Sequence, residues 1–152
     1  MIESDQAGML SALSQAQIAG SQDEVPVGAV VVHAGRVVGV GYNQREQTKN
    51  PVAHAEVLAI QQASRFLSSW RLVDCTLYST LEPCPMCLAA CQQARVQEVV
   101  FGALDPKGGA LSLGYRLNED LRTHHRFLAR YYETPACSQI LKEFFEKKRN
   151  SK

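Results

Sequence analysis

The segment that decides the fold is CTLYSTLEPCPMCLAACQQA, which runs from Cys75 to Ala94. Its first part, Cys75–Leu81, predicts a β-strand because it is mostly apolar and rich in residues that suit a sheet. The part from Pro85 to Ala94 predicts a short helix, since proline is favoured in the first helical turn. A strand that leads directly into a helix is typical of α/β domains.

The other predicted strands continue this pattern. The apolar run Val27–Val32 predicts a buried strand, and a turn at Ala34–Gly35 pairs it with Arg36–Val40 in a hairpin. Further strands are expected at Val96–Phe101 and Arg126–Tyr131. We therefore expect a three-layer α/β/α fold, in which a mixed five-stranded sheet carries helices on both faces.

Three more helices are predicted. The first precedes the hairpin, the second follows the break at Asn50–Pro51, and the last begins near Ala136. Spacings of three and four residues give them apolar faces that comprise Met9, Leu10, Leu13 and Ala16, then Ala55, Leu58, Ala59, Ala63 and Phe66, and finally Ile140, Leu141, Phe144 and Phe145.

The composition is that of an ordinary globular domain. The chain has 152 residues, of which 45% are hydrophobic and 20% charged, and its formal net charge is +1. This length suits one domain, residues 1–152, and the charge balance neither requires nor excludes a nucleic-acid partner. No apolar run is long enough to span a bilayer and no secretory leader is recognisable, so we expect a cytoplasmic protein.

Two of the five cysteines lie close together in the sequence. In a reducing compartment an odd number of cysteines argues against a disulfide framework. Cys84 and Cys87 share one face of a helix, and the positive end of the helix dipole lowers the pKa of both thiols. Such a pair can bind a metal ion, form a redox dithiol or occur by chance, and the pair alone leaves these alternatives open.

His54 supplies a third possible metal ligand. Zinc prefers nitrogen and sulfur ligands, and a catalytic zinc site has three protein ligands with a fourth position left open. His54, Cys84 and Cys87 match that arrangement. Cys91 is the one competitor for the fourth position, although a small buried side chain is the simpler interpretation of this cysteine.

Glu56 follows His54 in the stretch PVAHAE, residues 51–56. Two residues that are two positions apart in a helix point about 200° away from each other around its axis. The side chains of His54 and Glu56 can therefore approach the same metal site only if that site lies just beyond the helix N-terminus. Pro51 places the helix start there, and we expect the helix N-termini near His54 and Cys84 to converge on one metal. A neutral histidine and two thiolates balance the charge of Zn²⁺, so the metal can ionise a water while Glu56 serves as general acid and base.

The combination of HAE with PCxxC is the signature of zinc-dependent base deaminases. The chain resembles the cytidine deaminase-like superfamily and, within it, the bacterial tRNA adenosine deaminases, which convert the wobble adenosine of an arginine tRNA to inosine. The resemblance extends from about Val25 to Phe145. It rests on EVPVGAVVV (24–32), AHAE (53–56), SWRL (69–72), TLYSTLEPCPMC (76–87), VVFGALDPKGG (99–109) and FF (144–145).

This resemblance implies a role for each matching position. His54, Cys84 and Cys87 would hold one zinc ion per subunit, and Glu56 would shuttle protons. The residues that would surround the substrate are Asn43, as a hydrogen-bond partner of the flipped base, the backbone of Ala55, Val27 and Leu81 as pocket walls, Asp105 at the sugar of a flanking nucleotide, and Lys107 at a phosphate. The implied partners are a tRNA anticodon stem-loop and a second copy of the chain, since the family is homodimeric.

Two other functions are compatible with the same residues. A deaminase of a free base or nucleoside, such as guanine, cytosine or cytidine, would share every metal ligand and differ only in its pocket and loops. A structural zinc module closed by Cys91 would not be an enzyme. The lysine-rich end of the chain, residues 142–152, suits RNA binding and an ordinary helix C-terminus about equally.

Overall fold

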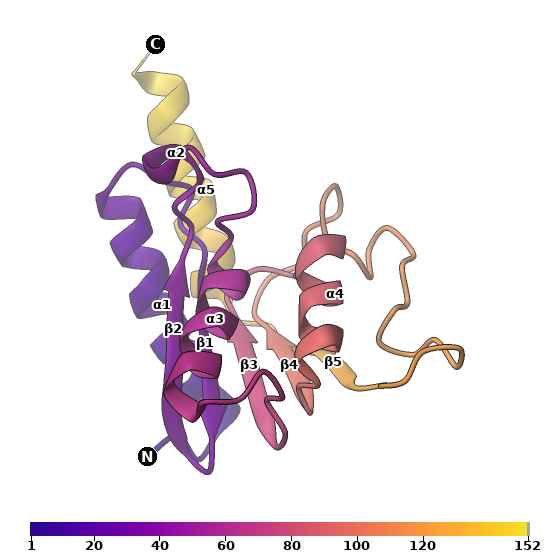
Figure 1. Cartoon of the computed structure of the whole chain (residues 1–152). Coiled ribbons are helices and arrows are strands. Elements are labelled where there is room, and N and C mark those ends of the chain that lie inside the picture. Colours follow the sequence, from indigo (N-terminus) through magenta and orange to yellow (C-terminus); the bar gives the residue numbers. More distant parts are fainter. Residues whose placement is uncertain (152) are drawn as a thin grey trace.

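The computed structural model describes residues 1–151, which form one sheet flanked by helices (Figure 1). The helices are α1 (Asp5–Ser21), α2 (Arg45–Thr48), α3 (Ala55–Leu67), α4 (Pro85–Ala94) and α5 (Pro135–Asn150). The strands are β1 (Gly28–His33), β2 (Arg36–Tyr42), β3 (Cys75–Ser79), β4 (Glu98–Phe101) and β5 (Leu128–Tyr131).

The sheet has the strand order β2-β1-β3-β4-β5. Strand β1 is antiparallel to both β2 and β3, whereas β3, β4 and β5 run parallel to one another. The prediction of a mixed five-stranded sheet is therefore confirmed. Parallel neighbours require a crossover, and α4 is the helix that connects β3 to β4.

The residues of β1 divide between two hydrophobic cores, one on each face of the sheet. Ala29 and Val31 belong to the core that includes α3 and α4, whereas Val30 and Val32 belong to the core that includes α1. This alternation follows from the two-residue period of a strand. The predicted helices on both faces are confirmed, and β1 is buried between them.

Helix α3 lies unusually close to the sheet. A Cβ atom at Gly41 would collide with the backbone oxygen of Ala55, and one at Gly39 would collide with that of Ala59. The glycines of β2 thus face the alanines of α3 with no room for a side chain between them. Since Ala55 is the first residue of α3, this contact fixes the position of the helix N-terminus.

Three residues of the predicted apolar faces are in fact exposed to solvent, and one of them, Phe145, is 45% exposed in the last helix. Leu10 is 57% exposed, because the buried stripe of α1 contains Met9, Ala12 and Leu13 and leaves Leu10 on another side of the helix. Phe66 is 70% exposed, because α3 buries a stripe of alanines and Phe66 lies in its last turn. The prediction that these side chains belong to the core was wrong.

Strand ends also differ from the expected ones. Strand β3 ends at Ser79 rather than Leu81, β4 begins at Glu98 rather than Val96, and β5 begins at Leu128 rather than Arg126. In each case the predicted strand extends past the residues that pair with a neighbouring strand and takes in one apolar residue that packs against the core from a loop, namely Leu81, Val96 or Phe127. Burial in a loop and burial in a strand give the same apolar signal, so the sequence cannot separate them.

Helix α2 was not predicted. It is a single turn whose N-terminal amides are held by Glu24, which is only 1% exposed. The Glu24 carboxylate accepts hydrogen bonds from the backbone N–H of Glu46, at 3.1 Å, and of Gln47, at 2.6 Å. A partner more than 20 residues away leaves no local pattern, which explains why the helix was missed.

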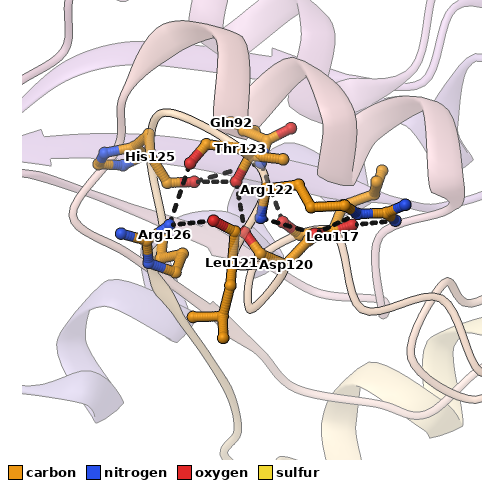
Figure 2. Close-up of polar contacts among 8 residues, drawn as sticks. All are labelled: Gln92, Leu117, Asp120, Leu121, Arg122, Thr123, His125 and Arg126. Carbon is orange, nitrogen blue, oxygen red and sulfur yellow. Dashed lines mark hydrogen bonds and ion pairs between the residues drawn. The ribbon is translucent and has the colours of Figure 1, made fainter.

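A long connection, residues 102–127, joins β4 to β5 without forming a strand or a long helix. It is the orange segment beside α4 in Figure 1. The Gln92 amide on α4 donates hydrogen bonds to the carbonyl oxygens of Leu117, at 2.9 Å, and His125, at 3.2 Å (Figure 2). Such contacts give the connection a defined course over α4.

Within residues 1–151, no helix combines the length and hydropathy that crossing a membrane requires.

Candidate active site

His54, Cys84 and Cys87 come together at the N-termini of α3 and α4. His54 is the N-cap of α3, Cys84 is the N-cap of α4, and Cys87 lies in the first turn of α4. The Nδ1 atom of His54 lies 3.6 Å from the Sγ of Cys84 and 3.5 Å from the Sγ of Cys87. The expected convergence of two helix N-termini is thus observed, and the three residues form a cluster that could hold a metal ion.

The spacing of these atoms suits a single tetrahedral ion. Ligands bound to one zinc at about 2.0 Å for nitrogen and 2.3 Å for sulfur would lie roughly 3.6 Å apart. The observed nitrogen–sulfur distances, 3.6 and 3.5 Å, agree with that value. Cys91 is not part of the cluster; it is fully buried in the core on the α3 and α4 face.

Within the cluster, the surroundings favour the thiolate form of Cys84. The pKa of Cys84 is lowered to about 4, mainly because its sulfur accepts a hydrogen bond from the Cys87 thiol, which outweighs burial. The expectation that the pKa of both thiols is lowered is wrong for Cys87, whose pKa is raised, first by that same hydrogen bond and then by burial. The pKa of His54 is also raised, chiefly by its hydrogen bond with Cys84. A thiolate at the start of a helix is the state that binds a cation.

Glu56 lies beside the cluster and is only 3% exposed. Its Oε1 atom is buried and has no hydrogen-bond partner within residues 1–151. Burial raises the pKa of this carboxyl group to about 7, and the negative charge of Cys84 adds to the effect. A carboxyl group with a pKa near neutrality can both accept and release a proton at physiological pH.

A cavity of about 450 Å³ opens over these groups. Five residues predicted to surround a substrate line it together with His54, Glu56 and Cys84: Val27, Asn43, Ala55, Leu81 and Asp105. Its walls are mainly apolar with a few polar groups, as is usual for a small-molecule or base pocket. The structure thus brings together the residue before β1, the residue after β2, the N-terminus of α3, and the loops after β3 and β4.

Asn43 is held in place by the backbone around it. Its side-chain amide donates to the carbonyl of Val25 at 3.2 Å, and its side-chain oxygen accepts from the backbone N–H of Arg45 at 3.2 Å. An asparagine amide has two donor hydrogens, and its oxygen has two lone pairs. One donor and one acceptor site therefore stay available for a ligand in the cavity.

Lys107 is the one predicted substrate residue outside the cavity. It is exposed, in the turn that begins at Asp105, and its backbone N–H donates to the Asp105 carboxylate at 3.3 Å. The N–H of Gly108 donates to the same carboxylate oxygen at 3.1 Å. The two predicted residues of this loop therefore lie at different depths, Asp105 in the cavity wall and Lys107 on the surface.

Six cavity residues were not predicted from the sequence: Val25, Arg45, Glu82, Leu104, Leu141 and Phe145. Leu141 and Phe145 come from α5, at the far end of the chain, and only tertiary packing brings them here. Arg45 lies on the unpredicted α2. Leu104 and Glu82 adjoin the predicted residues Asp105 and Leu81 and lie in the quoted segments VVFGALDPKGG and TLYSTLEPCPMC, which are the sequence signals that could have identified them.

Comparisons with known proteins agree on one family. Residues 3–149 match the MafB19-like deaminase family. The tRNA-specific adenosine deaminase of Aquifex aeolicus is 41% identical over 140 residues, which are 92% of this chain and 93% of that relative.

Among solved structures, the chain is also similar to deaminases. One, from biochemical and structural studies of A-to-I editing by tRNA:A34 deaminases at the wobble position of transfer RNA, is 40% identical with a TM-score of 0.79, over 91% of this chain and 99% of that one. The guanine deaminase of Bacillus subtilis is 30% identical with a TM-score of 0.66, over 97% and 95% of the two chains. The chain therefore belongs to the MafB19-like deaminase family, among the relatives of the tRNA-specific adenosine deaminases.

Proposed function

We propose that this protein is a zinc-dependent deaminase that converts the wobble adenosine of a tRNA anticodon loop to inosine. The observation that carries the proposal is the buried Glu56 carboxylate, whose Oε1 has no hydrogen-bond partner within residues 1–151, beside the His54–Cys84–Cys87 cluster in the lining of a cavity of about 450 Å³. The choice of tRNA over other substrates is supported by the relatives at about 40% identity, which are named for that activity.

Zinc is the metal that the donor set fits best. One histidine nitrogen and two cysteine sulfurs are zinc ligands, and three protein ligands with an open fourth position are the catalytic arrangement. When bound, zinc supplies the Lewis acidity that makes a water ionise near neutral pH. Cys91 lies outside the cluster, in the core, which counts against a structural site closed by four protein ligands.

Glu56 acts as the general acid and base of the reaction. Water replaces the amino group at C6 of adenine and ammonia leaves, so one proton must move from water to a ring nitrogen and another to the departing amine. Glu56 Oε1 lacks a partner and its pKa is raised to about 7, so it can take up and release these protons in turn. Because the carboxylate is buried, its protons are transferred away from bulk solvent.

The remaining cavity residues bind and orient the base. The free donor and acceptor sites of Asn43 suit a hydrogen bond to the purine edge, and Val27 and Leu81 offer apolar surface to its faces. The backbone of Ala55, at the start of α3, meets the base next to Glu56. A pocket of this kind admits only a base that is extruded from its stack, as bases in an anticodon loop can be.

The other expected properties are part of the same proposal. We infer one domain over residues 1–152, a homodimer, an arginine tRNA as substrate and a cytoplasmic location. Asp105 on the cavity wall would meet a flanking nucleotide, and Lys107 on the surface would meet a phosphate. In α5, Leu141 and Phe145 adjoin the cavity and the basic residues of the last turn follow them, so one helix could contact both the base and the backbone.

A free-base deaminase is the competing function, and the likeness to the guanine deaminase of Bacillus subtilis favours it. One assay separates the two. Purified zinc-loaded protein is given an anticodon stem-loop with a wobble adenosine and, separately, free adenine, guanine, cytosine and cytidine. Inosine in the RNA with inert free bases supports the proposal. Turnover of a free base with inert RNA refutes the tRNA substrate while preserving the deaminase chemistry.

A further inference from the structure

Glu82 is a buried carboxylate between the metal cluster and the Asp105 loop, and it is only 2% exposed. Its Oε1 accepts a hydrogen bond from the backbone N–H of Asp105 at 3.1 Å. Ser112 donates twice, from its backbone N–H to Oε2 at 2.8 Å and from its hydroxyl to Oε1 at 2.6 Å. One side chain therefore binds both ends of the segment 105–112.

This segment is fitted closely around Glu82. A Cβ atom at Gly109 would collide with the Glu82 carboxylate, so only glycine is accommodated there. The N–H of Ala110 donates to the carbonyl of Pro83 at 2.8 Å, and the N–H of Glu82 donates to the carbonyl of Ala103 at 2.8 Å. The loop that carries Asp105 is thus attached to the residues immediately before Cys84.

A carboxylate suits this position for a specific reason. Burying a charge is unfavourable unless hydrogen bonds compensate it, and Glu82 has no ion pair within residues 1–151. All three of its bonds come from neutral donors, and both of its oxygens accept. A glutamine would have one acceptor oxygen and would set its own N–H groups against a donor of the loop.

We propose that Glu82 is a positioning residue, which holds Asp105 in the cavity wall at a fixed place relative to the metal cluster. Its Oε1 accepts two of these hydrogen bonds and its Oε2 accepts the third, so the carboxylate is bound to the loop and acts on the substrate through the position of Asp105. Substrate affinity is the quantity it controls, because the loop forms one wall of the cavity. This role rests on the proposed function only for the identity of the substrate.

Two variants disturb the same contact, one at the Glu82 carboxylate and one at the loop glycine. Glu82→Gln removes an acceptor, whereas Gly109→Ala displaces the loop from the same carboxylate and leaves every charge unchanged. Glu98→Gln is the matched control, because the Glu98 carboxylate on β4 forms an ion pair with Arg130 on the neighbouring strand β5 and is not part of the cavity lining. For each protein we would measure zinc content, the backbone amide exchange of Asp105 and Ser112 by NMR, and kcat and KM on the anticodon stem-loop.

We expect Glu82→Gln and Gly109→Ala to keep zinc, to speed exchange of both amides and to raise KM by about tenfold with little change in kcat. The double variant should be no worse than either single one, since both act on one contact. Unchanged amide exchange in Gly109→Ala, or a loss of kcat without a rise in KM, would overturn the positioning role. Amide exchange needs no substrate, so an inactive wild-type protein would refute the proposed tRNA activity and still leave Glu82 tested.

Discussion

The Sγ atom of Cys87 lies 3.5 Å from Nδ1 of His54, although the two residues are 33 positions apart in the sequence. The contact exists because α3 and α4 begin at the same place, above the sheet, with His54 and Cys84 as their N-caps. Both helix dipoles point their positive ends at the cluster, which adds to the hydrogen bonds that favour the thiolate form of Cys84. The predictions below follow from this arrangement and from the contacts that maintain it.

Metal content should depend on Cys87 and not on Cys91. Cys87→Ser is expected to purify without a full equivalent of zinc, because it removes one of three ligands. Cys91→Ser should keep zinc and lose some thermal stability, because it places a hydroxyl group in the core. Metal analysis by mass spectrometry checks both. Zinc lost from Cys91→Ser would instead support a closed structural site.

Turnover should depend on the Glu56 carboxylate. Glu56→Gln keeps the size of the side chain, so zinc content and melting temperature should stay close to those of the wild-type protein. Loss of the proton-transfer group is expected to lower kcat by about 10²- to 10⁴-fold. The measurement is inosine formation in the stem-loop. Activity within threefold of the wild type, roughly, would rule out Glu56 as the general acid and base.

The position of the α3 N-terminus should depend on the absence of a side chain at Gly41. A methyl group at Gly41 would meet the backbone oxygen of Ala55, which cannot move without displacing the helix. Gly41→Ala is therefore expected to lower the free energy of unfolding by about 1–3 kcal/mol and to weaken zinc binding.

Gly20→Ala is the control for that variant. The new methyl group would meet only the Cβ of Pro26, at 3.5 Å, and alanine suits the helix α1 better than glycine. It should stabilise the protein by about 0.5–1 kcal/mol. Chemical denaturation measures both changes, and equal effects of the two substitutions would contradict the close packing of α3 on β2.

Stability at high pH should depend on Tyr78. Burial and a 3.0 Å hydrogen bond to Asp5 raise the pKa of its hydroxyl from 10.0 to about 12. Between these values the native protein keeps a proton that the unfolded chain has lost, so the free energy of unfolding falls as the pH rises.

Tyr78→Phe removes that titrating group. Its free energy of unfolding should therefore fall less steeply than that of the wild-type protein between pH 10 and about 12. Denaturant unfolding at several values in this range provides the comparison. Parallel curves for the two proteins would show that the Tyr78 hydroxyl is not selectively protected by folding.

A phosphate contact of Lys107 should appear in the salt dependence of RNA binding. Lys107→Ala is expected to reduce the slope of log affinity against log salt by about 1, because one fewer counterion is released. Arg36→Ala serves as control, since Arg36 begins β2 at the hairpin turn, the other end of that strand from the cavity residue Asn43. An unchanged slope for Lys107→Ala would remove Lys107 from the RNA-binding surface.

The types and local positions of the cluster residues were predictable from sequence. Proline at position 85 predicted the start of α4, and the limits of that helix, Pro85–Ala94, are confirmed. The argument that His54 and Glu56 can address one point only beyond a helix N-terminus also agrees with the structure, in which His54 is the N-cap. These features depend on neighbours within one helical turn, and such neighbours are visible in a sequence.

Other features were decided by tertiary structure alone. Leu141 and Phe145 reach the cavity from the last helix, and the buried Glu24 and Glu82 hold α2 and the Asp105 loop through partners more than 20 residues away. A glutamate on a solvated surface and a glutamate that organises a pocket have the same local sequence pattern. The sequence by itself determined which groups could bind a metal and transfer a proton. The tertiary structure decided the distances between them and the shape of the cavity, because hydrogen bonds and packing across the sheet leave no periodic signal in the chain.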